Sequence, residues 1–123
     1  MSGVLVLNQS KDKSQVPYQQ YFDEVANIST TPVKRSLGLG RSYVEISYLA
    51  GNGAAPTGKF LYVVLNAVTD ADAAVKLTVV GVRLVIPLGG VLKIQAVGKI
   101  TRIDLVSDTA ETGTSKTFIT SGA

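Results

Sequence analysis

The residue types that most often carry out chemistry in proteins are missing from this sequence. Its 123 residues contain no histidine, no cysteine and no tryptophan. Histidine is the commonest general base, cysteine supplies thiolate nucleophiles, and both are the usual ligands of soft metal ions. A Ser-His-Asp triad, a thiolate nucleophile and a thiolate metal site are therefore excluded. The candidates that remain are a glycine-rich loop and several carboxylates.

The glycine-rich loop has part of the spacing of a phosphate-binding loop. Residues 53–59 (GAAPTGK) match the pattern G-x-x-x-x-G-K. Such a loop continues with Ser or Thr, which holds Mg²⁺, and then enters a helix whose N-terminus faces the phosphates. Here Phe60 stands in place of the Ser or Thr, and aromatic and β-branched residues typical of a strand follow it. We therefore interpret this segment as a loop that leads into a strand.

The carboxylates are also better explained without chemistry. Asn66, Asp70 and Asp72 flank one turn and offer the oxygen ligands that Ca²⁺ prefers. The D-x-D spacing is common in ordinary turns, where Asp and Asn bond to their own backbone. We interpret a second group as solvated charges at strand ends: Asp104, Asp108 and Glu111. The sequence therefore predicts no catalytic residue, no metal site and no cofactor, and a protein that is not an enzyme.

The overall composition points instead to burial against other proteins. Hydrophobic residues make up 46% of the chain, aromatic residues 7% and charged residues 17%, against about a quarter charged in ordinary soluble domains. Such a chain exposes more apolar surface than a lone monomer normally keeps in water. We expect part of this surface to be covered by partner subunits.

Nucleic acid and membrane are not the partners that the sequence predicts. Twelve Lys and Arg against nine Asp and Glu give a net charge of +3, and the cations are scattered rather than arranged in a stripe among stacking aromatics. Apolar stretches such as residues 79–88 are interrupted and are far shorter than the ~20 residues of a membrane helix. Residues 1–8 lack the basic start of a signal peptide.

Short apolar segments separated by turn residues dominate the chain after residue 41. Within residues 42–49, Val44, Ile46 and Tyr48 alternate with more polar residues, which is the period of a half-buried strand. We expect strands at residues 42–49, 59–67, 73–80, 82–86, 91–97, 99–107 and 116–120, with one more at residues 4–7. About eight short strands at this spacing predict an all-β protein, an antiparallel, jelly-roll-like β-sandwich.

The first third of the chain has a weaker pattern. Residues 8–20 are polar and contain Pro17, residues 21–28 fit a helical turn or a strand, and residues 29–41 show no sustained period. Tyr18 and Phe22 are unusual in a disordered tail. We therefore divide the chain into an extended N-terminal arm, residues 1–41, and a β-sandwich body, residues 42–123.

The body resembles small virion proteins of tailed bacteriophages, particularly head decoration (cement) proteins. The resemblance is carried by VRLVIPLGGVLKIQAVGKITRIDLVSDTAETGTSKTFITSGA, in which a strand, I-P-x-G-G, a strand and an I-x-L-x-S-D ending follow one another. The extended Pro-, Gln- and Thr-containing arm before the body adds to it. The resemblance implies a jelly-roll-like homotrimer on the capsid surface of the virion, made in the host cytoplasm and clamped over capsomer junctions by its arm.

The function expected from this resemblance is structural. The protein would decorate and stabilise the phage capsid by binding between subunits of the major capsid protein, with further contacts to its own copies or other virion proteins. The arm would add strands to an adjacent subunit. The residues expected at protein interfaces are Val4, Val6, Tyr18, Tyr21, Phe22 and Tyr43. Two alternatives remain open: a tail, neck or baseplate β-module, and a module that binds host glycans through its tyrosines.

Overall fold

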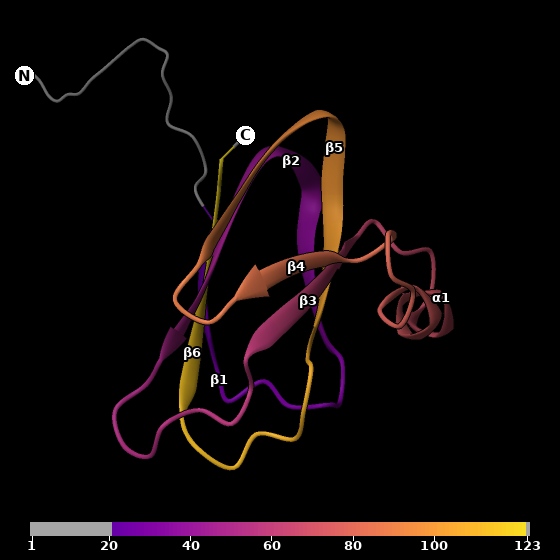
Figure 1. Cartoon of the computed structure of the whole chain (residues 1–123). Helices are drawn as coiled ribbons and strands as arrows, with labels where there is room; N and C mark the ends of the chain where they lie inside the picture. Colours follow the sequence, from indigo (N-terminus) through magenta and orange to yellow (C-terminus); the bar gives the residue numbers. More distant parts are fainter. Residues whose placement is uncertain (1–20, 123) are drawn as a thin grey trace, which may run out of the picture.

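A computed structural model describes residues 21–122, and these form one antiparallel sheet with the strand order β1-β6-β2-β5-β3-β4 (Figure 1). The elements are β1 (Tyr21–Ala26), β2 (Val33–Ala50), β3 (Phe60–Leu65), α1 (Asp70–Lys76), β4 (Leu84–Pro87), β5 (Val91–Ser107) and β6 (Ser115–Gly122). The prediction of an antiparallel all-β protein is confirmed. The finer prediction of a jelly roll stays a prediction.

The two long strands β2 and β5 pair from Val33 opposite Leu105 to Ser47 opposite Val91, with interruptions, and bend together, as Figure 1 shows. Their register shifts between Ser36 and Arg41 and again before Tyr43. Gly38 and Gly40 have φ angles of 67° and 105° at this point, a region that L side chains rarely adopt. A Cβ at Gly40 would lie 2.7 Å from Lys99 Cβ, so the close approach of β2 to β5 also requires glycine there.

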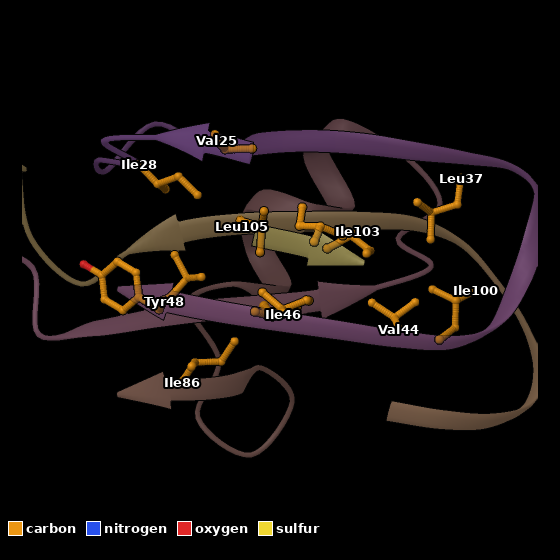
Figure 2. Close-up of a cluster of buried hydrophobic side chains, with 13 residues drawn as sticks. Val25, Ile28, Leu37, Val44, Ile46, Tyr48, Ile86, Ile100, Ile103 and Leu105 are labelled. Carbon is orange, nitrogen blue, oxygen red and sulfur yellow. The ribbon is translucent and has the colours of Figure 1, made fainter. Parts of the chain in front are cut away.

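The bend gives the two halves of each long strand different neighbours. The second half of β2 pairs with β6, and β6 pairs with β1. The last residues of β5 pair with β3, and β3 pairs with β4. Side chains from both groups of strands meet in one hydrophobic core (Figure 2), whose members include Val25, Val44, Ile46, Tyr48, Leu61, Val63, Ile103, Leu105 and Ile119. The alternation expected within residues 42–49 is thus confirmed, with Val44, Ile46 and Tyr48 all buried.

The strand expected at residues 73–80 is wrong, because α1 begins at Asp70 and includes Ala73. Thr69 caps this helix, and its hydroxyl accepts a hydrogen bond of 3.0 Å from Asp72 N. The Asp72 carboxylate accepts one of 2.9 Å from Val68 N and forms an ion pair with Lys76. These contacts satisfy amides that a helix start leaves unpaired. In the part of the chain that the structure describes, no helix has the length and apolar character needed to cross a membrane.

The expected boundary between arm and body, after residue 41, falls inside β2. Residues 21–26 form β1, which settles the choice between helical turn and strand, and β1 pairs with β6. Val25, Ile28 and Leu37 are buried in the core. Residues 21–41 are therefore part of the folded sheet, while the strand expected at residues 4–7 lies outside the described residues.

Candidate docking surface

Exposed apolar side chains gather along one part of the chain. Of the ten large hydrophobic side chains that the described structure leaves exposed, seven lie between Val75 and Val91. Five exposed residues belong to β3, to β4 or to the turn that joins α1 to β4, and we call them the apolar flank: Phe60, Val79, Val80, Val82 and Val85. Val80 is 81% exposed. An exposed group of this kind on a folded domain marks a contact surface.

The pairing of β3 with β4 creates the strand part of the apolar flank. Phe60 lies opposite Pro87, and Tyr62 lies opposite Val85. Because side chains alternate across a sheet, Ile86 points into the core, where it is 1% exposed, while Val85 lies on the outer face beside Phe60. Among the strands of residues 21–122, β4 is at the edge of the sheet, and none of these strands covers its outer side.

The helix α1 covers the neighbouring part of the same outer face. Ala73 and Leu77 pack against Val64 and Val106 in a second hydrophobic cluster, which Tyr62 completes on its border. This cluster stops short of Phe60 and Val85, which remain exposed. The position of α1 thus sets the limit between the covered and the uncovered part of the outer face.

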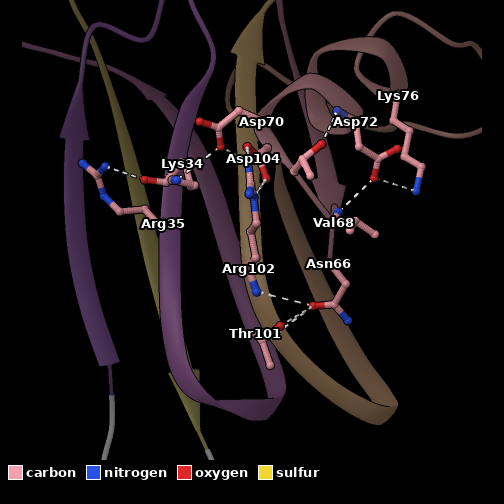
Figure 3. A network of polar contacts seen from close by, with 11 residues as sticks. Lys34, Arg35, Asn66, Val68, Asp70, Asp72, Lys76, Thr101, Arg102 and Asp104 are labelled. Atoms are coloured by element: carbon pink, nitrogen blue, oxygen red, sulfur yellow. Dashed lines mark hydrogen bonds and ion pairs between the residues drawn. The ribbon is translucent and has the colours of Figure 1, made fainter.

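A polar network ties the start of α1 to the sheet (Figure 3). The Arg102 guanidinium donates to both Asp104 oxygens, at 2.7 and 3.0 Å, and to Asp70 Oδ1 at 2.7 Å. Lys34 Nζ also contacts Asp70 Oδ1, at 3.2 Å. The hydrogen bonds that Arg102 donates to Asp104 raise the pKa of Arg102, and those from Arg102 and Lys34 lower the pKa of Asp70. Through Asp70, the network holds the start of α1 against β2 and β5.

The residues considered as Ca²⁺ ligands are engaged within the chain. Asp70 and Asp72 contact Arg102, Lys34 and Lys76. The Asn66 side chain accepts a hydrogen bond of 2.8 Å from Thr101 N, as Figure 3 shows. Within residues 21–122 no cluster of carboxylates forms that could hold a metal ion.

Residues 77–92, which include most of the apolar flank, contain one charged residue, Arg83. Between Asp72 and Asp104 the sequence has no acidic residue, and its cations there are Lys76, Arg83, Lys93, Lys99 and Arg102. The Arg83 guanidinium lies 3.7 Å from the centre of the Tyr62 ring and donates to the Leu77 carbonyl, a cation–π contact. The apolar flank therefore offers a partner an apolar surface with the Arg83 cation at its border, which suits an apolar partner surface that carries an acidic group.

The glycine-rich loop does not form a phosphate site, because its backbone N–H groups already donate hydrogen bonds to carboxylates of this chain. Glu111 accepts hydrogen bonds from Thr57 N at 2.8 Å, Gly58 N at 3.2 Å and Gly113 N at 2.8 Å. Asp108 accepts from the amides of the two residues that follow Gly58. We call this arrangement the loop clasp: residues 51–60 held against residues 107–114. It supports the interpretation of the segment as a structural loop.

Acid should weaken the loop clasp through Glu111. Burial acts to raise the pKa of Glu111, but the amides of Thr57, Gly113 and Gly58 outweigh it, so the pKa is lowered from its ordinary 4.5. A lowered pKa adds stability that is present above pH 4.5 and is lost as the pH falls through the folded-state value. We expect Glu111→Gln to be less stable than wild type at pH 7, with a smaller further loss on acidification.

Urea unfolding between pH 7 and pH 3 measures this difference. Glu24→Gln is the matched control, because Glu24 is an exposed glutamate away from the loop clasp. A Glu111→Gln profile that runs parallel to the wild-type profile would refute the role given to the carboxylate.

The structure places some of the residues predicted at interfaces. Phe22 is 65% exposed and stacks on Phe118, with ring centres 6.0 Å apart. Tyr43 is half-buried, and its hydroxyl donates to Glu45 at 2.7 Å. Phe22 and Glu45 both lie opposite Thr120, so they share one face of the sheet. Tyr43 lies two residues before Glu45 in β2 and is therefore on the same face. Tyr21 begins β1, while the described residues do not include Val4, Val6 and Tyr18.

Sequence reasoning did not single out the apolar flank. The composition did indicate surplus apolar surface, and the low charge of residues 77–92, with Arg83 alone, was a local signal. The two strands expected at residues 73–80 and 82–86 imply burial of half of these side chains.

Comparisons with known proteins give no family. No protein-family model and no curated protein sequence matches the chain. Among solved structures, the chain is similar to one from a study of Bacillus endospore appendages, described as a novel family of disulfide-linked pili. The identity is 15%, the match covers 87% of this chain and 91% of that one, and the TM-score is 0.39. The similarity is too distant to carry an argument about fold family or function.

Proposed function

We propose that this protein is a non-catalytic structural subunit that binds another protein through the apolar flank. The form of this function that the sequence resemblance favours is a head decoration protein of a tailed bacteriophage, bound between major capsid protein subunits on the outer capsid surface. The observation that carries the proposal is the set of exposed apolar side chains between Phe60 and Val85, with the Arg83 cation beside them.

A surface of this size would bind weakly at one site and strongly when many copies bind a repeated lattice. Full burial of one valine is worth about 1.5 kcal/mol or slightly more, and Val80 and Val82 are both more than half exposed. One contact of this kind is weak, because association also costs translational and rotational freedom. Many such contacts, repeated over a symmetric shell and linked by self-association, give high avidity.

The N-terminal segment enters the proposal as a second contributor. Val4, Val6 and Tyr18 remain candidate docking residues that would add to an adjacent subunit. Because residues 21–41 belong to the sheet, any truncation that examines this contribution must stop at residue 20.

Binding to capsid shells tests the proposed function. Expanded, DNA-free shells assembled from the major capsid protein of the genome that encodes this chain would be mixed with the purified protein and sedimented. We expect saturable binding in many copies over the shell lattice, located by cryo-electron microscopy. The absence of binding to shells would overturn the decoration proposal. Incorporation into tails as a single ring, or affinity for host glycans with no affinity for shells, would replace it by one of the alternatives.

A further inference from the structure

Among the open strand edges in the described structure are those of β1 and of the start of β5. Within residues 21–122, β1 pairs with β6 on one side only, and residues 91–95 of β5 pair with β2 on one side only. The outer side of each carries a row of backbone N–H and C=O groups, a template for pairing with another chain. These edges are separate from the apolar flank.

The hydrogen bonds at the strand ends show which residues direct their backbone N–H and C=O groups toward the open edges. Asn27 N donates to Ser115 O, and because backbone groups alternate along an antiparallel strand, the outward ones in β1 belong to Phe22, Glu24 and Ala26. Tyr48 N donates to Gly90 O, and Gly89 N donates to Tyr48 O. By the same alternation, the outward backbone groups of β5 belong to Val91, Lys93 and Gln95.

These two rows complement each other in direction and length. β1 and β2 are both antiparallel to β6, and β5 is antiparallel to β2. Consequently β1 of one copy runs antiparallel to β5 of a second copy in the same orientation. With Glu24 placed opposite Lys93, Ala26 lies opposite Val91 and Phe22 opposite Gln95. None of these residues is proline, so each of the three pairs can exchange two backbone hydrogen bonds.

The charges favour this pairing over others. Lysine on an open edge normally discourages pairing with a further strand. A glutamate directly opposite removes that penalty, and opposite charges across a strand pair are stabilising. Glu24 lies 3.8 Å from Lys116 of its own copy, a distance that leaves it able to face Lys93. The edge of β4 is less suitable, because Pro87 has no N–H to donate.

We propose that the protein associates head to tail with a second copy of itself, with β1 of one copy added to residues 91–95 of β5 of the next. The contact is heterologous, so each addition leaves one free edge at either end, and copies continue into a closed ring or an open chain. This goes beyond docking through the apolar flank, and either contact can fail while the other holds.

Crosslinking between two single-cysteine variants tests the register. The natural sequence has no cysteine, so Ala26→Cys and Val91→Cys each introduce one thiol. A short bis-maleimide is expected to give crosslinked dimer when the two variants are mixed, and none with either variant alone. A mixture of Ala26→Cys with Lys99→Cys, a position beyond the paired residues, is the matched control.

The results of crosslinking separate the alternatives. No product from the mixture at concentrations where the wild type self-associates would overturn the proposal. Product from one variant alone would show a symmetric, isologous contact instead. Circular dichroism establishes that each variant is folded before it is crosslinked.

A charge exchange provides an independent measurement. Lys93→Glu is expected to weaken self-association by about tenfold relative to wild type. Adding Glu24→Lys to the same chain should restore most of the lost affinity. Light scattering over a dilution series measures the self-association of each variant. Lys99→Glu changes the net charge equally and should have little effect. Equal weakening by Lys93→Glu and Lys99→Glu, or no recovery in the double variant, would contradict the paired register. Binding to shells through the apolar flank should persist in Lys93→Glu, although with less avidity.

Discussion

Replacing Gly113 by alanine should lower the free energy of unfolding by about 3 kcal/mol, the upper part of the range for overpacked sites. A Cβ at Gly113 would overlap the carbonyl oxygen of Ala55, which also lies in the loop clasp. The oxygen belongs to backbone and cannot rotate away as a side chain would. The two loops would have to separate, which would also pull Gly113 N from Glu111 and Thr114 N from the Ala54 carbonyl.

Gly98→Ala is the matched control for this prediction. An added Cβ at Gly98 meets no atom within 4 Å, so the change should shift stability by no more than about 0.5 kcal/mol. Urea unfolding of the two variants beside wild type gives both values. Equal stabilities for Gly113→Ala and Gly98→Ala would mean that the loops are not held together as the structure shows.

The strands of the core were predictable because their side chains follow a simple period. Val44, Ile46 and Tyr48 alternate in the sequence and are all buried on one face of β2. The same reasoning failed for Val75, Leu77 and Val79, which alternate as well. There the capping by Thr69 and Asp72 determines the structure, since a capped first turn removes the cost of unpaired helix amides. The T-D-A-D spacing was a signal for this cap.

The N-terminal third was assigned to an arm because its strands depend on distant partners. Residues 33–36 of β2 show no period of their own and are ordered by pairing with residues 102–105 of β5. Leu37, which follows them, is buried in the core. Gly38 and Gly40 shape a bend inside β2 through their positive φ angles. A single sequence does not reveal such long-range pairing.

The sequence predicted the apolar character of the candidate docking surface but not its location. A chain with little charge and much aliphatic surface indicated contacts with partners, and the apolar flank has that character. Its location follows from two tertiary facts that the sequence does not state: α1 covers Val64 and Val106 but not Phe60, and β4 lies at the edge of the sheet. The aromatic residues expected at interfaces lie elsewhere, on the face that carries Phe22 and Tyr43.

Acidic substitutions in the apolar flank should abolish docking. In Val80→Asp/Val82→Asp, two carboxylates would replace exposed valines in the turn before β4. Each would have to lose its hydration on docking and would face the acidic group of the partner surface that the Arg83 cation favours. The double variant should therefore bind its partner at least about 100-fold more weakly, which corresponds to ~2.7 kcal/mol. Both residues lie outside the strands, so the fold should be unaffected.

Val68→Asp is the matched control, because Val68 is 82% exposed and Val80 is 81% exposed, but only Val80 belongs to the apolar flank. The most direct measurement is therefore the affinity of wild type, Val80→Asp/Val82→Asp and Val68→Asp for capsid shells, determined side by side by sedimentation. The account predicts near-complete loss of binding for the double variant and wild-type binding for Val68→Asp. Wild-type binding by a folded double variant would contradict it.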